Sequence, residues 1–190
     1  MMSIFTLTAQ PGNALGEGSL QNPNVRKTIA LLGAFCMFLS TIEYMIPKPA
    51  PFLRLGIANL PLMLALDIFP FPAYMVLVGI KVTGQALVTG TLFSPIFPFS
   101  LAGTALAALS MYALRRLCKH RVSFIGISTL GAMMSSISQI AMARWWLMGI
   151  GVRYIAPPFL AAGLITGVAL GIFCEVFVSR SRWHASLRVR

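Results

Sequence analysis

The stretch PPFLAAGLITGVALGIFCEVFV, residues 157–178, holds a single ionisable residue, Glu175, in 22 positions. About 20 predominantly apolar residues are enough for an α-helix to cross the hydrocarbon core of a bilayer. The whole chain has the same character, because 57% of its 190 residues are hydrophobic, 10% are charged and the mean hydropathy is +0.82. These values exclude an ordinary soluble domain and predict a protein of the lipid bilayer.

Five further apolar stretches precede this one. Together the six predict an all-α membrane protein, a bundle of six transmembrane helices. The second stretch is the weakest candidate, because it is short and contains Arg54, Asn59 and Pro61. The predicted spans are 28–46, 53–69, 72–90, 96–114, 124–148 and 157–178.

The basic residues are divided unequally between the two sides of such a bundle. Ten of the 15 lysines and arginines fall before the first span, between the fourth and fifth, or after the sixth. Because Lys and Arg are enriched in cytoplasmic segments, both termini are expected in the cytoplasm. Residues 1–26 then form a polar cytoplasmic tail, 27–179 the membrane domain and 180–190 a basic cytoplasmic tail. The net charge of +11 is thus mainly a topology signal, and no nucleic-acid-binding motif accompanies it.

Lys81 is the most unusual residue of the predicted spans. It stands about nine residues from either end of the third span, and ionisable groups at such depth mark candidate functional sites. Gln85 follows one helical turn later on the same face, so the pair predicts a polar cavity for an anion. The alternative is a structural ion pair between Lys81 and Glu43. Asp67 and Glu175 lie at the predicted cytoplasmic ends of spans and are interpreted as solvated or locally paired charges.

The segment IPKPAPFLRLGIANL, residues 46–60, follows Glu43 and contains three prolines in five positions. Prolines at this density forbid a helix and stiffen the chain. Lys48 and Arg54 add positive charge, and Asn59 leads into the second span. We expect a rigid, cationic lid above a binding site. Alternatively, the prolines only end the first span and the charges face water.

Two other helix faces carry unusual side chains. Gln139 and Ser135 are four residues apart on the fifth span, so both can point into the bundle. On the first span, Ala30, Gly33 and Ala34 form a stripe of small residues that lets another helix approach closely. From spacing alone, that helix can belong to the bundle or to a partner subunit.

Several classes of protein are disfavoured by what the sequence lacks. Its four acidic residues are scattered singly, without the clustered acids that hold a catalytic metal. It contains no phosphate-cradling GxxxxGK[ST] motif and no GxSxG or HExxH motif, so ATP hydrolysis by this chain is not expected. The three cysteines are widely separated and suggest neither a disulfide framework nor a zinc site. We therefore expect no enzyme activity, no cofactor and no bound metal.

The residues EYMIPKPAPFLRLGIANLPLMLAL, 43–66, are similar to the opening motif of the Gx transporter family, also called heptaprenyl diphosphate synthase component I. The resemblance extends over about residues 28–178 and includes Lys81, Ser100, Gly103 and Gln139. One departure is Ser135-Ser136, where the family is expected to have a His-Asn pair, so the ligand contact there is altered.

This resemblance implies a substrate-binding S component of an energy-coupling factor transporter in the bacterial inner membrane. Such a protein is a six-helix bundle that works with a membrane coupling subunit and ATPase subunits. The small-residue stripe of the first helix commonly meets the coupling subunit, which assigns Ala30, Gly33 and Ala34 to that interface. The synthase name is discounted, because the acids that prenyl transfer needs are absent.

The expected ligand is a small, amphiphilic, anionic molecule, such as a vitamin-like compound or an isoprenoid or quinone precursor. Lys81 and Arg54 would neutralise its charge, and Glu43 would position a cation or one of these bases. Hydrogen bonds from Gln85, Gln139 and Asn59 would orient it. The alternative is a stand-alone carrier coupled to protons or sodium, with Glu43 as the titrating group. A membrane-embedded enzyme, or its non-catalytic partner, ranks last.

Overall fold

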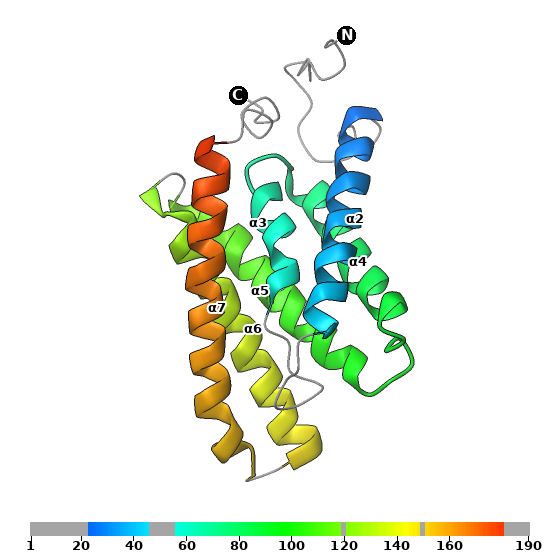
Figure 1. Cartoon of the computed structure of the whole chain (residues 1–190), viewed down its shortest axis with the longest axis vertical. Coiled ribbons are helices and arrows are strands. Elements are labelled where there is room, and N and C mark those ends of the chain that lie inside the picture. The colour runs from blue at the N-terminus through cyan, green and yellow to red at the C-terminus, as the bar shows by residue number, and fades with distance from the viewer. Residues whose placement is uncertain (1–22, 46–55, 119–120, 149–150, 181–190) are drawn as a thin grey trace.

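The computed structural model describes residues 23–45, 56–118, 121–148 and 151–180, and every regular element among them is helical (Figure 1). Five helices are long and apolar enough to cross a membrane. The expectation of an all-α protein with several membrane-spanning helices is therefore confirmed for these residues. In chain order the five are α2 (Pro23–Met45), α4 (Phe71–Val88), α5 (Ile96–Cys118), α6 (Phe124–Ala143), which continues into the π-helical turn η3 (Arg144–Met148), and α7 (Val152–Arg180).

The second predicted span, 53–69, differs from the prediction. Its described part is the 3-10 turn η1 (Ile57–Asn59) followed by the short helix α3 (Leu60–Ala65), and residues 53–55 lie outside the described part. A helix of six residues is about 9 Å long, much less than the roughly 30 Å of a hydrocarbon core. All six residues are buried, because α2, α4, α6 and α7 pack around them. This element is an interior helix and does not cross the membrane by itself.

Two helices begin earlier than predicted. The first residues of α2 belong to the stretch predicted as a tail, since the helix starts at Pro23. Helix α7 starts at Val152 and runs through Pro157 and Pro158, where the sequence suggested a start. The hydrogen bonds that these prolines forgo would have ended on carbonyls of the first turn. The first turn carries exposed side chains, including Tyr154, so the loss of these hydrogen bonds is tolerated.

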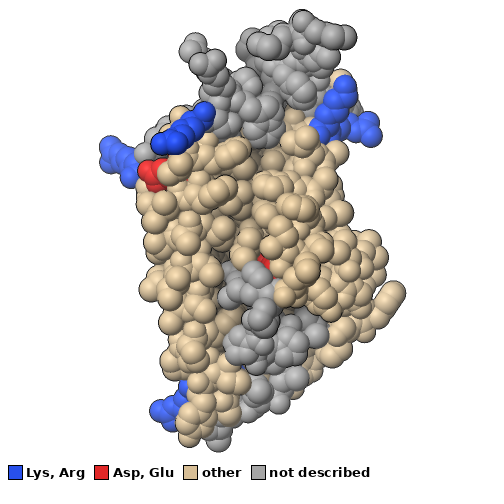
Figure 2. Space-filling view, viewed as in Figure 1, with Lys and Arg blue, Asp and Glu red and all other residues tan. Residues whose placement is uncertain are grey.

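The start of α2 and the end of α7 lie at the same end of the bundle (Figure 1, blue and red). On the face shown in Figure 2, Lys and Arg side chains gather at the two ends, and the broad band between them is almost uncharged. That band suits the hydrocarbon core of a bilayer. The side on which the termini lie remains a prediction.

Glycines bring α6 and α7 into close contact. Gly163, Gly167 and Gly171 repeat every four residues and form a stripe on the buried side of α7. A methyl group at Gly163 would lie 2.5 Å from Ser136 Oγ, and one at Gly171 would collide with the backbone of Ile125. Small-residue stripes of this kind allow membrane helices to pack backbone to backbone.

A buried ion pair joins the turn after α3 to α5. Arg115 Nε and Nη2 donate to the two carboxylate oxygens of Asp67 at 2.7 and 2.6 Å. Arg115 also donates to the carbonyl of Val122 at 3.3 Å, and its guanidinium lies 5.0 Å from the ring centroid of Phe124. The sequence predicted a solvated or locally paired charge at Asp67, and the structure shows the paired form, with Arg115 as the partner. The structure shows that they connect α3, α5 and the start of α6.

Candidate functional site

Lys81 lies at the centre of a buried group of polar side chains. Its side chain is 3% exposed, although α4 is one of the membrane-spanning helices. The ammonium Nζ donates to Asn59 Oδ1 at 2.8 Å and to Thr104 Oγ1 at 3.0 Å. One charged group therefore links α4 to η1 on one side and to α5 on the other. A buried ammonium in a membrane-spanning helix marks a candidate site for an anion.

Glu43 holds the chain segment that presents Asn59. Its buried carboxylate accepts hydrogen bonds from the backbone N–H groups of Gly56 and Ala58, each at 3.2 Å. Gly56 has φ 87°, a left-handed conformation that glycine adopts without steric cost. Three residues later, Asn59 ends the 3-10 turn and directs its side chain to Lys81. Glu43 thus positions a Lys81 ligand through the backbone.

Gln85 of α4 and Ser100 of α5 are buried polar residues close in sequence to Lys81 and Thr104. Gln85 follows Lys81 by one helical turn, and Ser100 precedes Thr104 by one turn. Both are buried, and neither Gln85 Oε1 nor Ser100 Oγ has a hydrogen-bond partner. We refer to Asn59, Lys81, Gln85, Ser100 and Thr104 as the Lys81 cluster.

Gln139 of α6 packs against α5 at Gly103, the residue before Thr104 in the sequence. Its side chain is 1% exposed, and Nε2 donates to Ser135 Oγ at 2.9 Å. Both groups lie against Gly103 on α5, where a methyl group would stand 2.9 Å from Gln139 Nε2 and 3.0 Å from Ser135 Oγ. The predicted pairing of Gln139 and Ser135 on an inward face is therefore present. The absence of a side chain at residue 103 is what lets the amide reach the backbone of α5.

The structure brings several of the predicted site residues together. Glu43 binds the backbone of Ala58, and the next residue, Asn59, accepts a hydrogen bond from Lys81. Gln85 lies on the same face of α4 as Lys81. Arg54 and the proposed lid around Lys48 lie outside the described residues. Thr104 was not among the predicted site residues, although Ser100 and Gly103 of the same span were named through the family resemblance. The available signal was the four-residue spacing of Ser100 and Thr104, which places two hydroxyls on one face.

The stripe of small residues on α2 divides between two environments. Gly33 is buried in the contact with α4, where a methyl group would lie 3.0 Å from Ile80 Cγ2. Ala30 and Ala34 are exposed on the outer surface of the bundle, beside the exposed Leu31 and Phe38. Of the three residues, Gly33 packs within the bundle, and a contact of the exposed Ala30 and Ala34 with a partner subunit stays a prediction.

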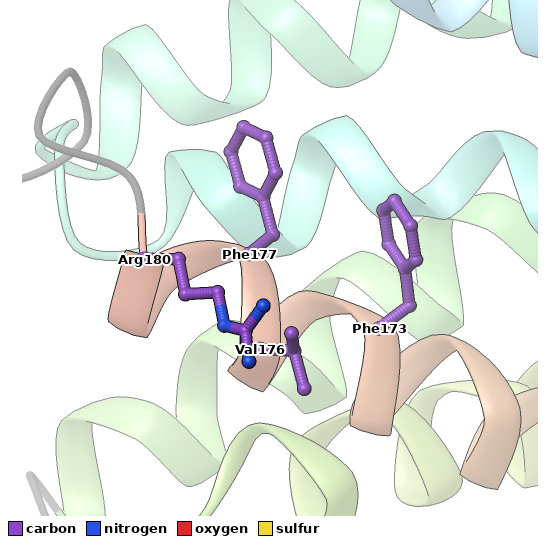
Figure 3. Close-up of a pocket in the computed structure, with 4 residues that line it drawn as sticks. All are labelled: Phe173, Val176, Phe177 and Arg180. Carbon is purple, nitrogen blue, oxygen red and sulfur yellow. The ribbon is translucent and has the colours of Figure 1, made fainter.

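A separate groove of about 370 Å³ lies on the last turns of α7 (Figure 3). Its lining consists of Phe173, Val176, Phe177 and Arg180, and the two phenylalanine rings stack with centroids 6.4 Å apart. Three of these four residues are apolar, so the groove offers few groups to orient a small ligand. The groove shares no residue with the Lys81 cluster. The polar groups that can orient a ligand lie in the Lys81 cluster.

The described part of the chain contains no group of three or more His, Cys, Asp or Glu side chains placed to hold a metal ion. The chemistry available in the Lys81 cluster is that of binding: one cation, hydroxyls and amides. These groups suit the recognition of a small polar or anionic molecule inside a membrane protein.

Comparison with known proteins agrees with the fold and the site. The family model described as heptaprenyl diphosphate synthase component I matches residues 32–177, which include every residue of the Lys81 cluster. No curated protein and no solved structure matches the chain. The family resembles the substrate-binding S components of energy-coupling factor transporters, so the resemblance seen in the sequence is confirmed. With most of its length matched, the chain belongs to the heptaprenyl diphosphate synthase component I family.

Proposed function

We propose that this protein is the substrate-binding component of an ATP-driven transporter of the energy-coupling factor type, in the inner membrane of a bacterium. The observation that carries the proposal is the buried ammonium of Lys81, hydrogen-bonded to Asn59 and Thr104 in the middle of a membrane-spanning helix. A cation at this depth is costly for a protein that only needs to be stable. Binding of a small, amphiphilic, anionic molecule would explain why a cation is buried at this depth.

The remaining predicted contacts are part of the same proposal. Gln85 lies one helical turn from Lys81 on α4, Gln139 of α6 packs against Gly103 of α5, and both would orient the ligand by hydrogen bonds. Arg54 adds a second cation from the segment outside the described residues. Glu43 keeps Asn59 in place through the backbone of residues 56–58.

Partner subunits supply the energy in this proposal. Ala30 and Ala34 present small side chains on the outer surface of α2, where a helix of a membrane coupling subunit can approach closely. ATPase subunits bind to that coupling subunit and not to this chain. Gly33 contributes by packing α2 onto α4.

The test compares the wild-type protein with Lys81→Met after gentle purification from a bacterial host. Native mass spectrometry is expected to show a co-purified small molecule on the wild type, bound at least about tenfold more weakly by the variant. Arg144→Gln is the matched control, because Arg144 is an exposed cation at the end of α6. Equal retention of the molecule by Lys81→Met would remove the central residue of the proposal.

The alternative of a stand-alone carrier with Glu43 as the titrating group is less well supported. The carboxylate of Glu43 accepts hydrogen bonds from two backbone N–H groups, so its contacts are those of a residue that holds the segment 56–58 in place. Reconstitution separates the two functions. Uptake into liposomes that contain only this chain, driven by a proton or sodium gradient without ATP, would establish the carrier. Formation of product from a prenyl diphosphate would instead establish an enzyme.

A further inference from the structure

Gln85 Oε1 and Ser100 Oγ are the two buried side-chain polar atoms without a hydrogen-bond partner in the described part of the chain. Gln85 is 3% exposed and Ser100 is 2% exposed. Leaving a buried polar atom unpaired destabilises a protein, and folded proteins contain few such atoms. Two of them on neighbouring helices therefore call for a common explanation.

The register of α4 and α5 places these two residues at the same level. The helices follow one another in the chain across the short connection 89–95, so they run in opposite directions. Lys81 Nζ contacts Thr104 Oγ1, which fixes one level of the pair. Gln85 lies four residues after Lys81 and Ser100 lies four residues before Thr104. Both therefore stand one helical turn, about 6 Å, nearer to the connection, and on the inward faces.

The chemistry of the two atoms defines the group that would satisfy them. An amide oxygen such as Gln85 Oε1 only accepts, whereas the hydroxyl of Ser100 can donate and accept. A ligand hydroxyl can donate to Gln85 Oε1 and accept from Ser100, and so can an amide through its N–H and C=O. An ionised carboxylate or phosphate has no proton to donate and cannot satisfy Gln85 Oε1.

We propose that Gln85 and Ser100 form a subsite for a neutral hydroxyl or amide group of the ligand, about 6 Å from the part bound at Lys81. The inference rests on the proposed function and narrows its substrate class. The ligand is a small acid that also carries a non-ionised O–H or N–H group one helical turn from its charge.

The first test measures stability in the absence of ligand. Gln85→Met and Ser100→Ala remove the two unpaired atoms without removing a protein hydrogen bond. Purified in detergent and freed of ligand, both variants are expected to melt at or above the temperature of the wild type. Ser110→Ala is the matched control on the same helix, because Ser110 Oγ donates to the carbonyl of Ala107 at 2.9 Å. If both variants melt below this control, the two atoms have partners within the protein and the subsite is refuted.

The second test measures binding of the natural ligand. The dialysable small-molecule extract of the expressing cells is added to the ligand-free proteins, and complexes are weighed by native mass spectrometry. Gln85→Met and Ser100→Ala are expected to bind the ligand at least about tenfold more weakly than the wild type and Ser110→Ala. The released ligand, weighed as an anion in H₂O and in D₂O, is expected to exchange at least one proton.

The outcomes separate this inference from the proposed function. Undiminished binding by Gln85→Met and Ser100→Ala, with loss of binding by Lys81→Met, overturns the subsite and leaves the proposed function standing. A released ligand anion that exchanges no proton in D₂O also overturns the subsite and leaves the proposed function standing. Undiminished binding by Lys81→Met, or a wild type that binds nothing from the extract, overturns the proposed function and the subsite with it.

Discussion

Some properties of the site around Lys81 can be predicted from the sequence, and others cannot. The position of Lys81 within an apolar span and the one-turn spacing to Gln85 are properties of one helix, so both could be predicted from the sequence. Its contacts with Asn59 and Thr104 depend on how three separate segments pack. The four-residue spacing of Ser100 and Thr104 indicates a polar face on α5, but no spacing along the chain shows that this face meets Lys81.

Gly56 offers a test of how the site is supported. Gly56→Ala is expected to lower the free energy of unfolding by about 1–2 kcal/mol, because an L residue at φ 87° is strained. The added methyl group would also lie 3.1 Å from Asn59 Nδ2, so ligand binding is expected to weaken as Asn59 shifts. Thermal unfolding in detergent and native mass spectrometry measure the two effects.

Gly90→Ala is the matched control for this substitution. Gly90 has φ 66°, but a methyl group there would meet nothing within 4 Å. A similar loss of stability with unchanged ligand binding is expected. Weakened binding in Gly90→Ala would mean that instability alone explains the result at Gly56.

At the scale of elements, hydropathy located the five long helices but misjudged the segment that became η1 and α3. A short apolar run can form a span or a buried interior helix, and its periodicity does not distinguish them. The residues around Leu62 are buried by neighbouring helices and not by lipid. That difference depends on tertiary contacts, so it could not be read from the segment alone.

The contact between α6 and α7 depends on glycine at specific positions. Gly171→Ala is expected to destabilise the protein by about 1–3 kcal/mol, because the methyl group would collide with the backbone of Ile125 and force the helices apart. Unfolding measured in detergent detects the change.

A substitution at Gly79 is not expected to destabilise the protein. Gly79 lies on an exposed part of α4, and a methyl group there would meet nothing within 4 Å. Gly79→Ala should leave stability unchanged or raise it by up to about 1 kcal/mol, since alanine is the better helix former. Equal destabilisation at Gly79 and Gly171 would contradict the packing explanation.

At the scale of the whole molecule, the Asp67–Arg115 pair connects segments that are distant in sequence. Asp67→Asn is expected to cost about 3–5 kcal/mol, because it leaves the buried guanidinium without its counter-charge. Arg116→Gln is the control on the same helix, where the exposed side chain contacts only the hydroxyl and ring of Tyr112 among the described contacts, and should cost far less. Unfolding in detergent compares the two, and similar losses would show that the pair contributes little.

The orientation of the bundle is a prediction for the intact protein in its membrane. A fluorescent protein fused to the C-terminus is expected to fluoresce in a bacterial host, and an alkaline phosphatase fusion to be inactive, because both termini are predicted to be cytoplasmic. The reverse pattern would invert the bundle and place the Gln85 and Ser100 level on the inner side.

The burial of α3 also bears on how the protein is assembled during synthesis. Each long helix can enter the bilayer when it emerges, but a six-residue helix cannot shield its ends from hydrocarbon. Three of the helices that cover it, α4, α6 and α7, are translated later. Residues 57–65 therefore reach their final environment only after the last helix has been made. Insertion of the chain into the membrane and completion of its binding site are thus separate events in time.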